Sequence, residues 1–221
     1  PNNNNRVAGY VFNEFKFTDQ TKAQIAGRIE HVELHGSTPD FPADFLPDGA
    51  PQSSVSRNPS YTPVSGSVGL IQNLPGDLVG SITAQYVERA PKPAELFSRG
   101  AHDATATFDI GNPNLTIETA KSVEIGLRKA TGPFRFEATA YYTRFSNFIY
   151  RRLTGVMCGG DFDSCGNGDP GNEGRQAVYS QRDATFRGAE FQSQLDIGAF
   201  NGGIWGIENQ FDVVRATFTD G

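Results

Sequence analysis

The sequence predicts an all-β protein, and specifically part of an antiparallel transmembrane β-barrel with long extracellular loops and short periplasmic turns. Three observations support this fold class. Polarity alternates from residue to residue over long segments, and these segments are longer than ordinary strands. The connections between them alternate strictly between short and long. Ordinary strands centre on about 5–6 residues, whereas a tilted strand that crosses a bilayer needs about 9–11.

The clearest alternation is FRFEATAYYTRF, at residues 134–145. Successive side chains of a strand leave opposite faces. One face would therefore carry Phe134, Phe136, Ala138, Ala140 and Tyr142, and the other Arg135, Glu137, Thr139 and Tyr141. The pattern fits a half-buried strand on a protein core. It also fits a strand with lipid on one side and a wet barrel interior on the other.

We expect eight strands with this period of two, and about eight strands would make only part of a larger barrel. Each has an apolar and a polar set, as where Val123, Ile125 and Leu127 alternate with Glu124 and Arg128. The strands cover approximately residues 6–18, 22–34, 63–73, 78–89, 119–129, 134–149, 184–197 and 203–215.

The connections carry more information than the strands. Four are short and rich in turn residues: TDQT, LPGD, TGP and GAFNG. The other three, at about 36–62, 90–118 and 150–183, are long and rich in Pro, Gly, Asp and Asn. Long structureless loops are uncommon in compact soluble domains, whereas outer-membrane barrels have short turns on one side and long loops on the other. The alternation therefore favours the membrane interpretation.

Composition excludes several classes of protein. The hydrophobic fraction is 37% and the mean hydropathy −0.43, and no run of about 18 apolar residues predicts a membrane helix. The net charge of −6 provides no basic patch, so no nucleic-acid partner is expected. No signal peptide is visible, and both ends, PNNNN and TFTDG, have loop-like sequences. We therefore expect the chain to be a fragment of a larger barrel.

The two cysteines lie in CGGDFDSC. Their proximity predicts a local disulfide between Cys158 and Cys165 and an oxidising compartment; the alternative is a loop with two reduced thiols. Asp161, Asp163 and Asp169 surround the pair and offer carboxylates that Ca²⁺ prefers. They follow no EF-hand pattern, which favours a solvated loop closed by a disulfide.

A set of motifs runs through the middle of the chain. R-A-P is followed by E-L-F (Arg89 to Phe97), then by G-N-P-x-L-x-x-E-T (Gly111 to Thr119), E-I-G-L-R (Glu124 to Arg128), F-x-N-F-I-Y (Phe145 to Tyr150) and A-T-F-R-G-A-E-F (Ala184 to Phe191). In this order and spacing, residues 61–215 resemble the barrel of TonB-dependent outer-membrane receptors.

The resemblance implies a plugged barrel of 22 strands in the cell outer membrane, which imports a scarce nutrient with energy from the TonB complex. Residues 1–221 would be a fragment of the barrel domain that lacks the plug domain, with its TonB box, and the C-terminal strands. The implied partners are outer-membrane lipid, the TonB complex through the missing plug, and a small-molecule or metal substrate. No resident cofactor is implied; the cargo would be zinc, haem or another iron chelate such as a siderophore.

The stretch SRGAHDATATFDIGNPNL is similar to the branch of this family that handles zinc and, more loosely, haem. The resemblance implies a ligand-binding role for His102 in a long loop, and the adjacent Asp103 adds a carboxylate. The alternative is a solvent-exposed histidine in a polar loop. Separately, alternation places His31, Glu33 and His35 on one face at the end of the second strand. They predict either a metal site at the barrel rim or an ordinary polar strand end.

No catalytic site is predicted, because the sequence contains no G-x-S-x-G, H-E-x-x-H or phosphate-binding glycine loop. Two alternatives to an energised importer stay open. One is a soluble β-sandwich or β-barrel module that binds a ligand or glycan, against which the loop alternation argues. The other is an outer-membrane barrel without TonB coupling, which only the region upstream of Pro1 would distinguish.

Overall fold

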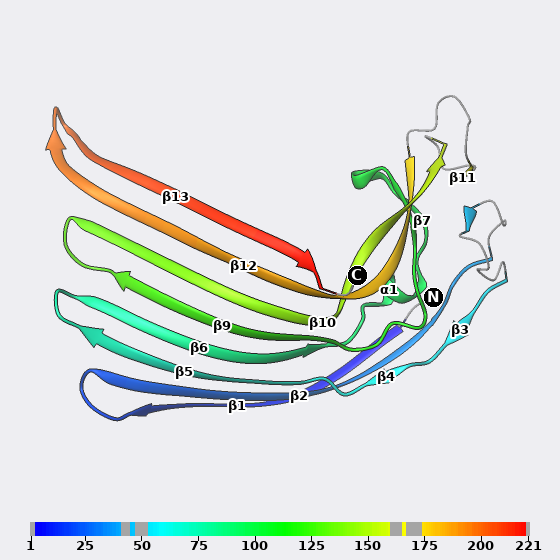
Figure 1. Ribbon diagram of the computed structural model, residues 1–221, viewed down its shortest axis with the longest axis horizontal. Coiled ribbons are helices and arrows are strands. Elements are labelled where there is room, and N and C mark those ends of the chain that lie inside the picture. The colour runs from blue at the N-terminus through cyan, green and yellow to red at the C-terminus, as the bar shows by residue number, and fades with distance from the viewer. Residues whose placement is uncertain (1–2, 41–44, 47–52, 160–164, 167–173, 220–221) are drawn as a thin grey trace.

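The computed structural model describes residues 3–40, 45–46, 53–159, 165–166 and 174–219. Long antiparallel strands lie side by side in one curved, open sheet (Figure 1). In sheet order these are β1 (Asn3–Lys16), β2 (Thr21–Ser37), β5 (Val64–Leu74), β6 (Leu78–Arg89), β9 (Glu118–Lys129), β10 (Phe134–Cys158), β12 (Gly174–Phe200) and β13 (Gly203–Phe218). Each of the eight predicted strands is present, and each long strand pairs with the next one along the chain, as in an arc of an up-and-down barrel.

Tight turns join the strands at one end of the sheet. Gly76 and Asp77 both have positive φ, of 78° and 60°, and so do Asn201 and Gly202, of 51° and 78°. Two successive residues with positive φ characterise the tight hairpin turns whose twist matches that of the flanking strands. Asn, Asp and Gly are the residues that adopt this conformation most easily. Their presence accounts for the short connections that the sequence predicts.

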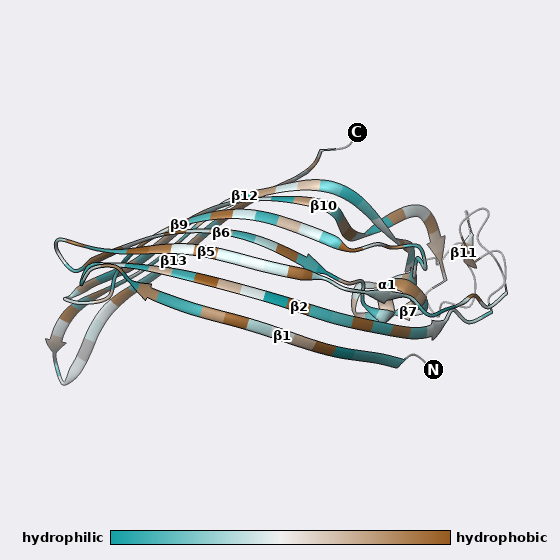
Figure 2. Cartoon of the chain, turned by 90° about the horizontal axis from the view of Figure 1, so that it is seen from below, coloured by the Kyte–Doolittle hydropathy of each residue, from teal (hydrophilic) through white to brown (hydrophobic). Residues whose placement is uncertain are grey.

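The pairing register confirms that each strand has one apolar and one polar face. Residues directly opposite each other share a face. One row across the sheet is apolar: Ile25, Val68, Ala84, Val123 and Tyr142. A row on the other face is polar: Arg128, Glu137, Gln192 and Gln210. Figure 2 shows the resulting bands of opposite hydropathy along the strands. We call these the apolar face and the lumen face.

Every long strand has exposed large apolar side chains on the apolar face. Val68 is 53% exposed, Ile125 58% and Phe211 58%. Aromatic residues stand towards the strand ends, and they are also exposed: Phe15, Tyr86, Phe134 and Trp205. An apolar surface of this extent marks a contact with another apolar medium, and an aromatic girdle is typical of a bilayer interface.

Short elements gather at the opposite end of the sheet from the tight turns (Figure 1). We call this region the cap; it comprises the described residues of 38–63, 90–117 and 146–183, with the strand ends that they contact. Its elements are β3 (Ser56–Arg57), β4 (Ser60–Tyr61), α1 (Pro93–Phe97), β7 (Arg99–His102), a 3₁₀ turn (Asp103–Thr105), β8 (Thr107–Ile110) and β11 (Cys165–Gly166).

The predicted loop at 150–183 was wrong at both ends. Strand β10 continues to Cys158, and β12 already begins at Gly174. Pairing between the two strands resumes after a bulge between Phe145 and Phe148, where Asn147 has a φ of 56°. The ladder therefore extends beyond the alternating segment, because a bulge bends a strand pair without ending it. The asparagine-rich start was also predicted as a loop, but β1 begins at Asn3.

The buried apolar residues among those described lie in the cap or at the strand ends beside it. One cluster contains Val32, Leu34, Leu96, Phe97 and Ile149. A second contains Phe45, Phe108, Ile110 and the two cysteines. None of the helical segments in the described part of the chain has the length and apolarity needed to span a membrane.

Candidate functional site

Helix α1 is held in the cap by a cluster of one guanidinium and two carboxylates. Arg89, at the end of β6, donates to both oxygens of Glu95 at 3.1 and 2.9 Å. It also donates to both oxygens of Glu118 at 3.1 Å each. Glu118 further accepts the backbone N–H of Ile149 at 2.7 Å. A bidentate guanidinium–carboxylate pair is strong and geometrically specific, so this cluster joins β6, α1, β9 and β10.

The glycine of the G-N-P motif lies against the end of α1. A Cβ atom on Gly111 would lie 2.5–2.6 Å from backbone atoms of Leu96, Phe97 and Ser98. The Gly111 N–H donates to the Ser98 carbonyl at 2.7 Å, and the Asn112 N–H donates to the Glu95 carbonyl at 2.9 Å. The R-A-P, E-L-F, G-N-P and E-T segments thus form one packed unit that folds the long connection over the end of the sheet.

Tyr61 attaches a second long connection to the same unit. Its hydroxyl donates to the Leu115 carbonyl at 2.9 Å, and its ring packs against the cluster around Leu96. Burial raises the pKa of the Tyr61 hydroxyl above its usual value. On the other side of the cap, burial lowers the pKa of Arg99 although Asp40 opposes the shift; Arg99 donates to the Pro39 carbonyl at 2.7 Å.

His102 lies at the exposed edge of the cap, at the end of β7. Its Nδ1 is 2.8 Å from the Thr105 hydroxyl, which lies 2.8 Å from the Thr107 hydroxyl. Thr107 donates to buried Asp109 at 2.7 Å. Arg151, on β10, contacts Asp109 at 3.1 Å and the Thr105 hydroxyl at the same distance. A continuous polar chain therefore runs from the exposed imidazole to a buried ion pair.

This polar chain is supported by the pairing of β8 with β12. Thr107–Ile110 runs parallel to Arg175–Val178 and antiparallel to Arg99–His102. Asp103, next to His102, begins the 3₁₀ turn and is exposed. Within the described residues, no three His, Cys, Asp or Glu side chains lie close enough together to hold a metal ion. The structure therefore offers His102 and Asp103 as exposed groups, not as a complete coordination shell.

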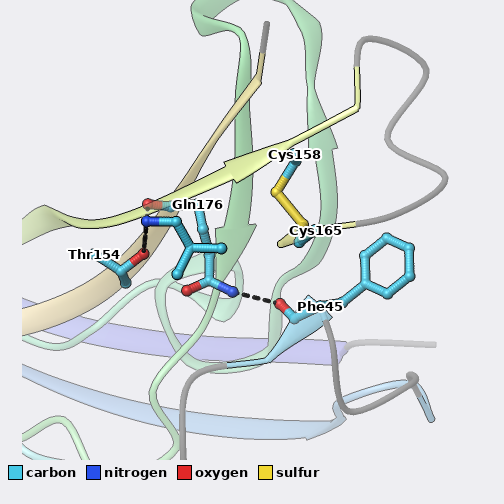
Figure 3. Close-up of a disulfide and its surroundings, with 6 residues drawn as sticks. Phe45, Thr154, Cys158, Cys165 and Gln176 are labelled. Atoms are coloured by element: carbon cyan, nitrogen blue, oxygen red, sulfur yellow. Dashed lines mark hydrogen bonds between the residues drawn. A yellow bond between two sulfur atoms is a disulfide. The ribbon is translucent and has the colours of Figure 1, made fainter. Parts of the chain in front are cut away.

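Cys158 and Cys165 form a disulfide, with an S–S distance of 2.03 Å, at the far end of β10 (Figure 3). Both cysteines are buried against Phe45, Phe108 and Ile110. Buried Gln176 donates to the Phe45 carbonyl at 2.7 Å and so joins this region to the first long connection. The predicted calcium ligands Asp161, Asp163 and Asp169 lie outside the described residues.

The three predicted ligands of β2 share one face, as alternation requires. His31 is opposite Val7, which places this set on the apolar face of the sheet at its cap end. The His31 Nε2 is 3.5 Å from the Glu33 carboxylate, and both side chains are about half exposed. The histidine Nδ1 is 3.3 Å from the Thr62 hydroxyl. The structure thus brings two of the three together, on the opposite face from the lumen.

The lumen face carries charged side chains in pairs. Arg135 makes a bidentate contact with Asp196 at 2.7 and 2.8 Å. Lys22 lies 2.9 Å from Glu14, and Arg28 lies 3.1 Å from Glu30. Towards the short turns, a polar groove is lined by Arg128, Arg135, Glu137, Gln192 and Glu208 among others. Such a surface suits water, because charged groups keep their hydration there.

The family profile described as "TonB dependent receptor-like, beta-barrel" matches residues 1–220. The chain belongs to the TonB-dependent receptor family. It is therefore part of a β-barrel of the cell outer membrane, and the apolar face is its lipid-facing surface. The motifs quoted from the sequence had indicated the same family.

Solved structures of receptors share the fold. The copper transporter OprC superposes with a TM-score of 0.64 at 14% identity, over 96% of this chain and 28% of that chain. The haemophore receptor HasR of Serratia marcescens gives 0.61 at 17% identity, over 97% and 34%. The alcaligin receptor FauA of Bordetella pertussis gives 0.57 at 13%, over 100% and 31%. The chain spans about a third of the length of each of these receptors.

Sequence reasoning missed the Arg89 cluster and the polar chain that starts at His102. Arg89, Glu95 and Glu118 were quoted only as family motif letters. Their contacts join residues 6 and 29 positions apart, which no strand or helix period relates. One local signal was available. Arg89 and Glu118 are opposite charges at the ends of two predicted strands, and these two strands pair in the structure.

Proposed function

We propose that this chain is the barrel portion of a receptor that imports a scarce nutrient across the outer membrane with energy supplied through TonB, and that the nutrient is a metal ion or a metal chelate. The observation that carries the proposal is the packed cap at the end of a barrel arc. It concentrates exposed polar groups beside a charged, hydrated lumen face, which is the arrangement that an import path requires.

The solved structures with the same fold support the class of cargo. One is a copper transporter, another is a haemophore receptor in complex with its haemophore and haem, and a third is an alcaligin receptor. At 13–17% identity these likenesses show the fold alone, so the class of cargo is part of the proposal and not a finding. The narrower proposal, zinc or haem, rests on exposed His102 and Asp103 in the cap. Imidazole and carboxylate are ordinary zinc ligands, and imidazole also binds haem iron.

In this proposal the polar chain behind His102 has a positioning role. Thr105 contacts the His102 Nδ1 and leaves the Nε2 of the ring available to a ligand. Arg151 and Asp109 hold the threonines from the buried side. The receptor would complete the coordination of the metal with groups from elsewhere in the whole protein or from the chelate itself.

Uptake of radioactive zinc and of iron-labelled haem by cells that express the whole receptor tests the proposal. We expect accumulation that stops when the TonB complex is deleted or the membrane potential is collapsed. Accumulation that continues without TonB would instead support a barrel without energy coupling. No accumulation of either cargo above that of receptor-free cells would overturn the zinc-or-haem proposal.

The variant His102→Ala tests the site itself. We expect zinc binding by the whole purified receptor to weaken about tenfold or more, as for loss of one metal ligand. Asn114→Ala is a matched control, because it removes another exposed polar side chain of the cap that belongs to no candidate metal site. Equal zinc affinity of His102→Ala and wild type, measured by titration calorimetry, would remove His102 from the site.

A further inference from the structure

We propose that Gln181 is a positioning residue for the candidate ligand site at His102, because its side chain fixes the direction in which the outer ends of β10 and β12 leave the barrel wall. We call these ends, residues 148–158 and 174–182, the arm. The arm supports the tip of the β7–β8 pair, where His102 lies. The proposed function supplies the ligand in this inference, whereas the position of the arm can be measured without any ligand.

The arm has no neighbouring strand of the wall to direct it. The last pair between β9 and β10 joins Thr119 to Ser146, and β13 ends at Phe218, opposite Ala184 of β12. Beyond this level, among the described residues, β10 and β12 pair only with each other and with the short strands β8 and β11. Figure 1 shows the arm turning out of the line of the sheet. A two-stranded ribbon is only marginally stable by itself, so the contacts at its base decide where it points.

The base of the arm is the bulge at Asn147, whose φ of 56° is unusual for a residue with a side chain. Side chains of β12 hold both of its backbone polar groups. The Asn147 N–H donates to the Asp183 carboxylate at 3.1 Å, and the Asn147 carbonyl accepts from the Gln181 Nε2 at 3.0 Å. A bulge bends the strand that carries it, so these two contacts fix the angle between the wall and the arm.

Gln181 also joins the bulge to the connection between β8 and β9. Its Nε2 donates to the Thr116 carbonyl at 2.9 Å, and its Oε1 accepts from the Thr116 N–H at 3.0 Å and from the Thr116 hydroxyl at 3.3 Å. Together with the bond to Asn147, the amide donates twice and accepts twice, which is its full capacity. Turning the amide over would place its oxygen against two carbonyls. The amide therefore has one stable orientation, and it ties the arm to the segment that leads into β9.

The arm in turn holds the tip of the β7–β8 pair. Strand β8 pairs with β12 within the arm. Close to His102, the Arg175 N–H of β12 donates to the Ala106 carbonyl at 3.0 Å. Arg151 of β10 contacts the Thr105 hydroxyl, which contacts the His102 ring. The other end of the β7–β8 pair is anchored beside α1. A change in the direction of the arm would therefore move the imidazole relative to the lumen while α1 stays in place.

The distance between two nitroxide labels in the whole purified receptor, measured by double electron–electron resonance, tests the position of the arm. One label replaces exposed Ala104, next to His102, and the other replaces exposed Ile125 on the wall. We expect one narrow distance in the receptor with native Gln181, and a broader, shifted distribution in Gln181→Ala. Zinc affinity, measured by titration calorimetry on receptors without labels, should fall about tenfold in Gln181→Ala, the lower end of the loss when the support of a metal ligand is removed.

Three further variants separate positioning from general stability. Gln181→Glu keeps an acceptor for Thr116 but cannot donate to the two carbonyls, so it should resemble Gln181→Ala. Asn147→Gly should keep the native distance, because Gln181 and Asp183 bind only the backbone of that residue and glycine adopts positive φ easily. Gln192→Ala removes an exposed glutamine from the wall part of β12 and should also keep the native distance.

A reference pair of labels at Val68 and Leu195, both exposed on the wall, reports on the barrel itself. An unchanged arm distance in Gln181→Ala, or a reference distance that changes as much as the arm distance, would overturn the proposal. A changed arm distance with native zinc affinity would also overturn it, if His102→Ala does weaken zinc binding. If His102→Ala binds zinc like wild type, the zinc proposal fails, and the arm distance alone then decides the role of Gln181.

Discussion

The strand body and the cap of this molecule are stabilised in opposite ways. The body is a ladder of paired strands whose large apolar side chains, such as Val68 and Ile125, are exposed. The cap buries its apolar side chains, such as Leu96 and Phe108, and fixes them with a charge cluster and a disulfide. Both regions come from one chain, and several strands run through both.

The difference shows which part depends on its surroundings. The body is held by backbone hydrogen bonds between neighbouring strands, and the side chains of both faces are left without a protein core. Its apolar face must therefore be covered by lipid, and its lumen face by water or by other parts of the barrel. The cap supplies its own core and its own polar partners. Substitutions in the body should therefore change stability by altering contacts with lipid or water. Substitutions in the cap should change stability by altering its internal packing.

The largest expected effect comes from adjacent residues of β10. Ala140→Arg places a guanidinium on the lipid side, level with Ile125 and Ala189, and should lower the free energy of unfolding in lipid by about 2–4 kcal/mol. Thr139→Arg faces the lumen opposite Glu190, and we expect a change below about 1 kcal/mol. Urea-driven unfolding of the whole receptor in lipid vesicles measures both. Equal losses would mean that the two faces do not meet different solvents.

Gly111→Ala should destabilise the cap by about 2–3 kcal/mol and leave the body unchanged. The added methyl would overlap backbone atoms of α1, and overpacking of this kind is costly. Gly100→Ala is the control, because a Cβ there meets nothing within 4 Å. Amide hydrogen exchange should show faster exchange in α1 and β7 only for Gly111→Ala. Faster exchange spread evenly over β5, β6 and β9 would contradict the independence of the cap.

Arg89→Met should lower the free energy of unfolding of the cap by about 2 kcal/mol. This is less than the loss for a fully buried ion pair, because the Arg89 side chain is partly exposed. It leaves the carboxylates of Glu95 and Glu118 without their shared cation. Adding Glu95→Gln and Glu118→Gln should restore part of the loss, because neutral amides need no counter-charge. Protease resistance of the cap in the whole receptor measures the effect. A triple variant less resistant than Arg89→Met would show that the carboxylates act in some other way.

The fold was largely predictable because the membrane imposes a simple pattern. Residues such as Ile125 and Glu124 alternate since lipid and water lie on opposite sides of the strand, and Asn201 with Gly202 marks a tight turn by its own chemistry. The cap was not predictable in this way. Gly111 packs against α1, and Gln176 contacts Phe45. These contacts join residues that are far apart in the sequence, and no local pattern predicts them. The direction of His31 and Glu33, away from the lumen, follows from alternation with Ile29, and the register confirms it.

The most direct test of the two-solvent arrangement is reagent accessibility along β10 in the whole receptor, reconstituted in lipid vesicles. Single cysteines at positions 136 to 142 would be labelled with nitroxides and exposed to oxygen, which partitions into lipid, or to a water-soluble nickel complex. We predict a period of two: oxygen contact at Phe136, Ala138, Ala140 and Tyr142, and nickel contact at Glu137, Thr139 and Tyr141. The same contact at neighbouring positions would contradict a barrel wall with lipid on one face and water on the other.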